Sequence, residues 1–263
     1  MGNTTAATFQ WGTAMTTAPE VSSLGCVLGL WAHPDDEAYL SAGLMAQARA
    51  HGNRVVVATA TLGERGTDDP TRWPPERLEK QRRIELAESL EVIDVHEHRL
   101  FGYPDGGLAD VPLAEGVARV AALLDEVRPD TVVTFGPDGM TGHPDHRTIS
   151  TWTTQAWLAA GGSTRLWYAA TTAAYHRKWG ELNDRIGVWS MAGPPPIARE
   201  DQLAFVLTCD EEMLDRKLAA LRAHHTQTAN LITMMGEEQY RQWWGEEAFT
   251  DAARVLDSLS PAT

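Results

Sequence analysis

The chain has 263 residues, of which 43% are hydrophobic and 22% are charged. This balance is typical of a globular protein with a sizeable core, and it excludes a disordered or collagen-like chain. Lys and Arg total 22 against 36 Asp and Glu, which gives a formal net charge of −14. Because such an acidic surface repels phosphate groups, we expect neither nucleic acid nor membrane as a partner.

The two cysteines, Cys26 and Cys209, are too few for a disulfide framework or an all-thiolate zinc site. No run of 18 apolar residues is present, and the first 23 residues lack the basic and apolar regions of a secretory signal. We therefore expect a cytoplasmic protein. Residues 1–23 are predicted to be a flexible tail, and residues 24–263 a single domain with a less regular C-terminal part.

Strand-like and helix-like segments alternate up to about residue 175. In chain order we expect a strand at 27–31, a helix at 37–50, a strand at 54–61, a helix at 76–90, a strand at 95–101, a helix at 113–127, a strand at 131–135, a helix at 144–158 and a strand at 166–174. Further on, a strand is expected at 203–208, and a helix capped by Asp210 is expected to end near His225. This alternation predicts an α/β fold, a Rossmann-like three-layer sandwich with a mainly parallel central sheet and helices on both faces.

Four polar loops follow strands of the predicted sheet, at 32–37, 62–75, 102–110 and 136–146. Ligands of an open parallel sheet bind outside the carboxyl ends of its strands, so we expect the chemistry in these loops. The first loop reads AHPDDE, and the fourth ends in HPDH.

These two runs offer the ligands of a catalytic metal site, which needs about three His or carboxylate side chains and one open position for water. His33 and Asp36 are three residues apart across a turn and can face one point. The third ligand would be His143 or His146, from the end of another strand. Nitrogen and oxygen donors favour Zn²⁺, with Fe²⁺ as the alternative.

The remaining groups of both runs fit a hydrolysis. Asp35, beside Asp36, is the candidate general base that takes a proton from the attacking water. His143 would stabilise the oxyanion and protonate the leaving amine, if Asp145 orients it and raises its pKa. The alternative is structural, because Asp-rich and Pro-containing turns are also common helix caps. Two such runs at strand-to-helix junctions favour the functional interpretation.

AHPDDE at 32–37 together with HPDH at 143–146 resembles the PIG-L/LmbE-like superfamily of zinc-dependent N-acetylglucosaminyl de-N-acetylases. The resemblance extends over residues 27–227. The resemblance implies three metal ligands, namely His33, Asp36 and His146, so that the choice of His146 over His143 depends on it alone.

The same resemblance implies that Asp35 is the base and that His143, supported by Asp145, acts on the oxyanion and the amine. It also makes Arg82, in the helix predicted at 76–90, the substrate-binding arginine. An arginine in an apolar helix row turns toward a partner, whereas the alternative is a surface pair with Glu85.

Two further features are less specific. His224 lies in the last turn of a predicted helix, where it would interact with the helix dipole, and the resemblance keeps it as a wall of the site. Trp73, in the second polar loop, is the first candidate among ten Trp residues for stacking on a sugar or an aromatic group. The run at 243–247, WWGEE, matches no motif of the family.

The mycothiol-type members of this family carry a Gly-Gly-Tyr run before HPDH, and here Thr141 stands at the tyrosine position. This disfavours a mycothiol-pathway role. We expect a metal-dependent hydrolase that removes the acetyl group from an N-acetylated amino sugar, of N-acetylglucosamine type, or a glycoconjugate. The alternatives are an amidase acting on a mycothiol-type thiol conjugate or an acylated natural product, and a noncatalytic sugar-binding protein. The sequence leaves the sugar, the acyl group and a homo-oligomeric state open.

Overall fold

The computed structural model describes residues 20–189, 191 and 196–259. Its seven strands are β1 Val27–Trp31, β2 Val55–Thr59, β3 Glu97–Leu100, β4 Thr131–Phe135, β5 Arg165–Ala170, β6 Leu203–Thr208 and β7 Glu246–Asp251. The α-helices within the described ranges are α1 Asp36–Ala50, α2 Pro75–Val92, α3 Leu113–Val127, α4 Pro144–Ala159, α5 Ala173–Ile186, α6 Glu211–Ala223, α7 His225–Met235, α8 Glu237–Trp243 and α9 Ala252–Leu259. Short 3₁₀ turns lie at Val21–Ser23, Leu108–Asp110 and Glu200–Gln202.

All seven strands form one sheet in the order β3-β2-β1-β4-β5-β7-β6. The first five are parallel, and β7 runs antiparallel to both β5 and β6. Strands β1, β2 and β4 are buried along their whole length because helices cover both faces, and their Val and Leu residues suit that environment. The predicted α/β class with a mainly parallel sheet is confirmed.

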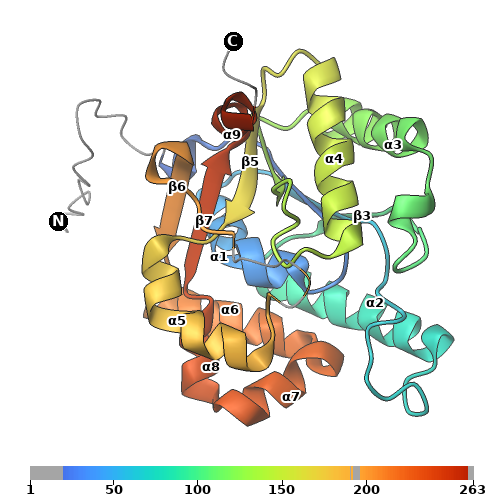
Figure 1. Ribbon diagram of the computed structural model, residues 1–263, viewed down its shortest axis with the longest axis vertical. Helices are drawn as coiled ribbons and strands as arrows, with labels where there is room; N and C mark the ends of the chain where they lie inside the picture. Colours follow the sequence, from blue (N-terminus) through green and yellow to red (C-terminus); the bar gives the residue numbers. More distant parts are fainter. Residues whose placement is uncertain (1–19, 190, 192–195, 260–263) are drawn as a thin grey trace.

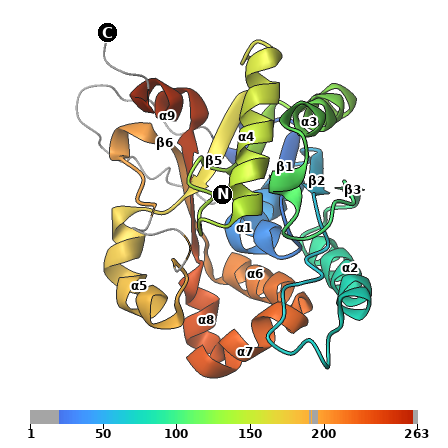
Figure 2. The same cartoon turned by 45° about the vertical axis from the view of Figure 1, so that its right-hand side comes forward.

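The helices form the two outer layers of the sandwich (Figures 1 and 2). Helices α3 and α4 contact each other on one face of the sheet, whereas α6 contacts both α1 and α2 on the other. Helices α6, α7 and α8 also contact one another and extend this second layer (Figure 1). Within the described ranges, no helix combines the length and apolar character needed to cross a bilayer.

The C-terminal part is more regular than the sequence predicted. The expected strand at 166–174 ends at Ala170, and its last residues begin α5 instead. Strand β7 was not expected, yet it lies between β5 and β6. The cap of α6 is confirmed, since the Asp210 side chain accepts the Met213 N–H at 2.9 Å. Most of the predicted tail, residues 1–19, lies outside the described residues.

Candidate active site

The predicted site residues lie at the carboxyl ends of β1 and β4, two neighbouring strands at the centre of the sheet. From β1 the chain moves outward to β2, whereas β4 continues the sheet in the opposite direction. This reversal of strand order opens a crevice that is the usual binding position in such sheets. His33 lies two residues after the end of β1, and His143 caps α4 after β4.

The three predicted metal ligands converge in this crevice. His33 Nδ1 lies 3.1 Å from His146 Nε2, and Asp36 contributes Oδ1 at 3.4 Å from His146 Nε2 and Oδ2 at 3.7 Å from His33 Nδ1. The His33 backbone N–H donates to Asp36 Oδ2 at 2.8 Å and fixes the carboxylate. All three side chains are largely buried.

The outer contacts of both imidazoles orient their inner nitrogens toward one point. His146 Nδ1 lies 3.0 Å from the Gly139 carbonyl, so this nitrogen donates and Nε2 keeps its lone pair. His33 Nε2 lies 3.2 Å from both Asp105 and Asp145, which likewise leaves Nδ1 facing inward. Two facing lone pairs repel each other unless a proton or a cation lies between them, and a divalent metal ion between these donors would meet the same requirement.

The charges around this point also favour a cation. Burial raises the pKa of the Asp36 carboxyl to about 7, because the charged form is desolvated. Although burial lowers it, hydrogen bonds with Asp105 and Asp145 raise the pKa of His33 to about 10. A positive charge at this position is therefore stabilised by the surrounding carboxylates.

Asp145 has a different partner from the one expected. Its carboxylate is fully buried and accepts the backbone N–H groups of Gly106 at 2.8 Å and Leu108 at 3.1 Å, besides contacting His33. His143 instead accepts the Asp145 backbone N–H at Nδ1, at 3.2 Å. Burial lowers the pKa of His143, whereas the charge of Asp145 opposes this change, and the support of His143 by Asp145 stays a prediction. The physical reason for the different partner of Asp145 is that the 102–110 loop supplies N–H groups that draw the carboxylate toward His33.

Asp35 borders the crevice in an unusual backbone conformation, with φ at 111°. A non-glycine residue there is strained by about 1–3 kcal/mol. The Asp35 N–H donates to Glu37 Oε2 at 2.9 Å, and Arg82 lies 3.3 Å from the Asp35 carboxylate. Burial raises the pKa of Asp35, whereas the Arg82 charge opposes this change.

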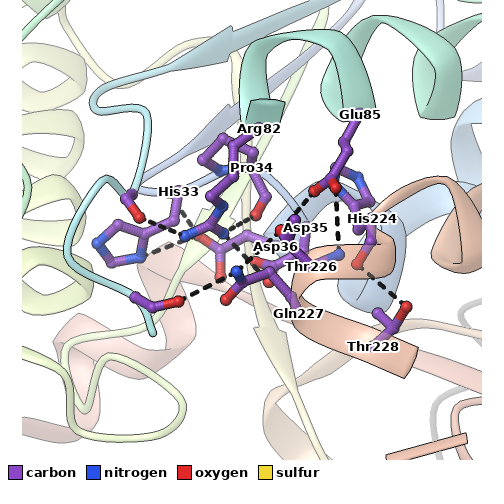
Figure 3. A network of polar contacts seen from close by, with 12 residues as sticks. His33, Pro34, Asp35, Asp36, Arg82, Glu85, His224, Thr226, Gln227 and Thr228 are labelled. Carbon is purple, nitrogen blue, oxygen red and sulfur yellow. Dashed lines mark hydrogen bonds and ion pairs between the residues drawn. The ribbon is translucent and has the colours of Figure 1, made fainter. Parts of the chain in front are cut away.

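Arg82 reaches from α2 to the loop after β1 and is only 3% exposed (Figure 3). It donates to the carbonyl oxygens of Pro34 and Gly63 and contacts Asp35. At Gly63, where φ is +61°, an added Cβ would lie 1.9 Å from the guanidinium, so only glycine fits there. The structure thus shows Arg82 as a support of the Asp35 loop, and a contact with substrate stays a prediction.

The alternative prediction, a surface pair of Arg82 with Glu85, is wrong. Glu85 is buried and accepts both the N–H and the hydroxyl of Thr226. His224 lies at the C-terminal end of α6, close to the predicted helix end, and its side chain is buried. Its Nε2 lies 2.7 Å from Glu37 Oε1, and both side chains are fully buried. Glu37 also accepts the Asp35 N–H, so His224 supports the Asp35 loop through Glu37, and α7 begins at the next residue, His225.

A cavity of about 260 Å³ opens from the metal-site residues. Its lining combines the catalytic end with side chains from the C-terminal part: Asp35, Asp36, Tyr39, Leu40, Met140, Thr141, His146, Val188, Gln227, Leu231, Trp243 and Trp244. The sequence analysis assigned no role to Trp243 and Trp244. Trp73, by contrast, is not in this lining and lies against the guanidinium groups of Arg72 and Arg77.

Among the described residues, two groups have ligand atoms close enough to hold a metal ion, His33 with His143 and His146, and His33 with Asp105 and Asp145. The fold and this His/Asp crevice define an α/β protein with a candidate metal centre at the reversal of strand order. The model of the GlcNAc-PI de-N-acetylase family, PIG-L, matches residues 28–157. Two relatives named 1D-myo-inositol 2-acetamido-2-deoxy-alpha-D-glucopyranoside deacetylase are 32% identical (Saccharomonospora viridis) and 33% identical (Nocardia farcinica). The aligned parts cover 76% and 78% of this chain, and 84% and 81% of the relatives. The chain belongs to the PIG-L family, which confirms the resemblance.

Solved structures show the same fold at lower identity. A conserved protein of Thermus thermophilus superposes with a TM-score of 0.60 at 24% identity, over 86% of this chain and 94% of that one. N,N'-diacetylchitobiose deacetylase of Pyrococcus horikoshii superposes with a TM-score of 0.59 at 20% identity, over 90% and 87%.

Proposed function

We propose that the protein is a metal-dependent hydrolase that releases acetate from an N-acetylated amino sugar of N-acetylglucosamine type or its glycoconjugate. The observation that carries the proposal is the convergence of His33, Asp36 and His146, with Asp35 beside them at a cavity. The relatives' names support the substrate class, since each denotes a deacetylase of an acetamido sugar.

His33, Asp36 and His146 would hold the metal ion, and their nitrogen and oxygen donors suit Zn²⁺, with Fe²⁺ as the alternative. When bound, such an ion acidifies water and polarises the amide carbonyl. Asp105 and Asp145 fix the His33 ring from outside, as partners of metal-binding histidines commonly do.

Asp35 takes the proton of the attacking water in this mechanism. Its carboxylate borders the cavity, and burial makes it a stronger base than an exposed aspartate. The strained backbone that Glu37 restrains keeps the Asp35 side chain beside the Asp36 ligand. Arg82 limits the movement of the same loop.

His143 donates a hydrogen bond to the developing oxyanion, and the proton that Asp35 takes from the attacking water passes to the leaving amine. Because Nδ1 accepts from the backbone, the neutral ring carries its proton on Nε2 and can donate there. The ring lies close to both metal-site histidines, with centroids 4.7 Å from His33 and 5.1 Å from His146. Thr141 contacts His146 Nδ1 at 3.3 Å and belongs to the metal side of the cavity.

The test is Asp35→Asn in the zinc-loaded enzyme. We expect the variant to retain one metal ion per chain while amine release from N-acetylglucosaminides falls by about 10²–10⁴-fold. Asp125→Asn, on the exposed surface of α3, is the matched control and should keep the wild-type rate. Failure of the wild type to release amine from any acetamido sugar would favour the amidase alternative. Equal rates in Asp35→Asn and wild type would refute the role of Asp35.

A further inference from the structure

The outer wall of the cavity is apolar, in contrast to its catalytic end. Tyr39 and Leu40 come from α1, Leu231 from α7, and Trp243 and Trp244 from the end of α8 and just beyond it. The rings of Tyr39, Trp243 and Trp244 lie 5.4–6.1 Å apart, measured between centroids, and form one aromatic cluster. The C-terminal residues of this wall lie outside the range that the family model matches.

Two of the three polar atoms of these rings are already paired within the protein. The Tyr39 hydroxyl lies 2.7 Å from that of Tyr240, and the Trp243 indole N–H donates to Asn183 Oδ1 at 2.8 Å. The Trp244 indole nitrogen is shielded from solvent and has no hydrogen-bond partner among the described residues. The rings therefore offer carbon surface to an occupant of the cavity.

Among the described residues of the lining, Gln227 is the one amide side chain outside the catalytic end, and its amide group is also engaged. Its Nε2 donates to the Gly66 carbonyl and to the Thr226 hydroxyl, both at 3.1 Å (Figure 3). A polyol such as inositol would bury several hydroxyl groups here with few partners, and each unpaired group weakens binding by roughly tenfold or more. An apolar occupant has no such penalty and gains from burial.

We propose that the outer part of this cavity binds an apolar alkyl or aryl group of the substrate, next to the N-acyl group that is hydrolysed. This inference rests on the proposed function and narrows its substrate class. The apolar group is either the aglycone of an acetamido sugar or an extended N-acyl chain, because both would extend from the reacting amide into the cavity that Asp35 and Trp244 share. The preferred substrate would differ from the inositol glycosides for which the relatives are named.

Two substrate series separate the two sources. The first consists of N-acetylglucosaminides with methyl, butyl, hexyl and phenyl aglycones, together with the inositol glycoside. The second consists of methyl glucosaminides with acetyl, butanoyl and hexanoyl groups on nitrogen. With the zinc-loaded enzyme, we expect kcat/KM for amine release to rise about fourfold per added methylene in one series until the cavity is filled.

Leu231→Gln adds a polar group to the half-buried part of the wall. We expect it to lower the hexyl-to-methyl ratio of kcat/KM by about tenfold, or the hexanoyl-to-acetyl ratio if that series responds. Leu158→Gln, at an exposed position of α4 outside the cavity, is the matched control and should leave the ratio unchanged.

Amine release that is independent of chain length in both series, or a preference for the inositol glycoside over every apolar substrate, would overturn the inference and leave the proposed function intact. A ratio that is equal in Leu231→Gln and wild type would also overturn it. Release of no amine from any substrate would overturn the proposed function itself, and this inference with it.

Discussion

The buried carboxylate of Glu37 offers a direct test of how the catalytic loop is held. It accepts three hydrogen bonds, from the Asp35 N–H at 2.9 Å, the His224 Nε2 at 2.7 Å and the Ser89 hydroxyl at 3.1 Å. Glu37→Gln keeps the shape but removes the charge. Hydrogen bonds to a charged group contribute roughly 1 kcal/mol more than neutral ones, so three of them predict a loss of about 3 kcal/mol. Loss of a buried ion-pair partner gives the same order of magnitude.

Glu37→Gln should also slow catalysis, because the amide has only one acceptor oxygen for the N–H groups of Asp35 and His224. Without the hydrogen bond to Glu37, Asp35 can leave its strained conformation, and a displaced carboxylate takes the proton of the attacking water less efficiently. We expect kcat to fall at least about tenfold. Urea unfolding gives the free energy, metal analysis checks that Asp36 still binds its ion, and amine release gives the rate.

Ser89→Ala is the matched control, because it removes only the longest of the three hydrogen bonds. We expect it to cost about 1 kcal/mol and to leave the rate within about twofold of the wild type. If Glu37→Gln proved no less stable than Ser89→Ala, the ion pair with His224 would not hold the loop. A stability loss with an unchanged rate would separate Glu37 from catalysis.

Three further outcomes are expected. Burial lowers the pKa of His224, but the charge of Glu37 raises it, so that it lies above 6.5 in the folded protein. The stability that this His224–Glu37 pair contributes is therefore complete below pH 6.5 and is lost as the pH rises through the folded-state pKa of His224. The stability gap between wild type and His224→Gln should therefore shrink from pH 6 to pH 9 in urea titrations, and a constant gap would contradict this. Lys217→Met leaves the buried Glu247, whose carboxylate lies 2.5 Å from the Lys217 ammonium, without its cation. It should destabilise the protein by about 3–5 kcal/mol in urea, and Glu247→Gln added to it should restore part of this loss. Removal of metal by a chelator should abolish amine release and lower Tm, Zn²⁺ should restore both, and full activity in metal-free protein would exclude the metal mechanism.

The sequence predicted the elements around the site to within a few residues. Residues 131–135 are one example: they are rich in β-branched residues, which favour a strand. Predicting such a strand requires no knowledge of distant contacts. The sequence also predicted that His33 and His146 lie close together, because the carboxyl ends of parallel strands meet at one edge of the sheet. Local pattern and topology were sufficient for these features.

Other features depend on contacts that a linear pattern does not contain. Strand β7 begins with Glu246 and Glu247, which are unusual in a strand. The buried Glu247 carboxylate is stabilised in this strand because it accepts hydrogen bonds from the N–H groups of Gly43 and Leu44 and from the Lys217 ammonium. Asp105 could have been noticed in the third polar loop, but its contact with His33 depends on how that loop folds.

The order β5-β7-β6 has a consequence for biosynthesis. Strand β7 is the last described strand to be translated, and β6 has no other strand neighbour in the sheet. Until residues 246–251 leave the ribosome, β5 exposes an unpaired edge and β6 cannot join the sheet. A nascent or prematurely terminated chain therefore exposes strand edges that favour aggregation, and chaperones would be needed most at this late stage of synthesis.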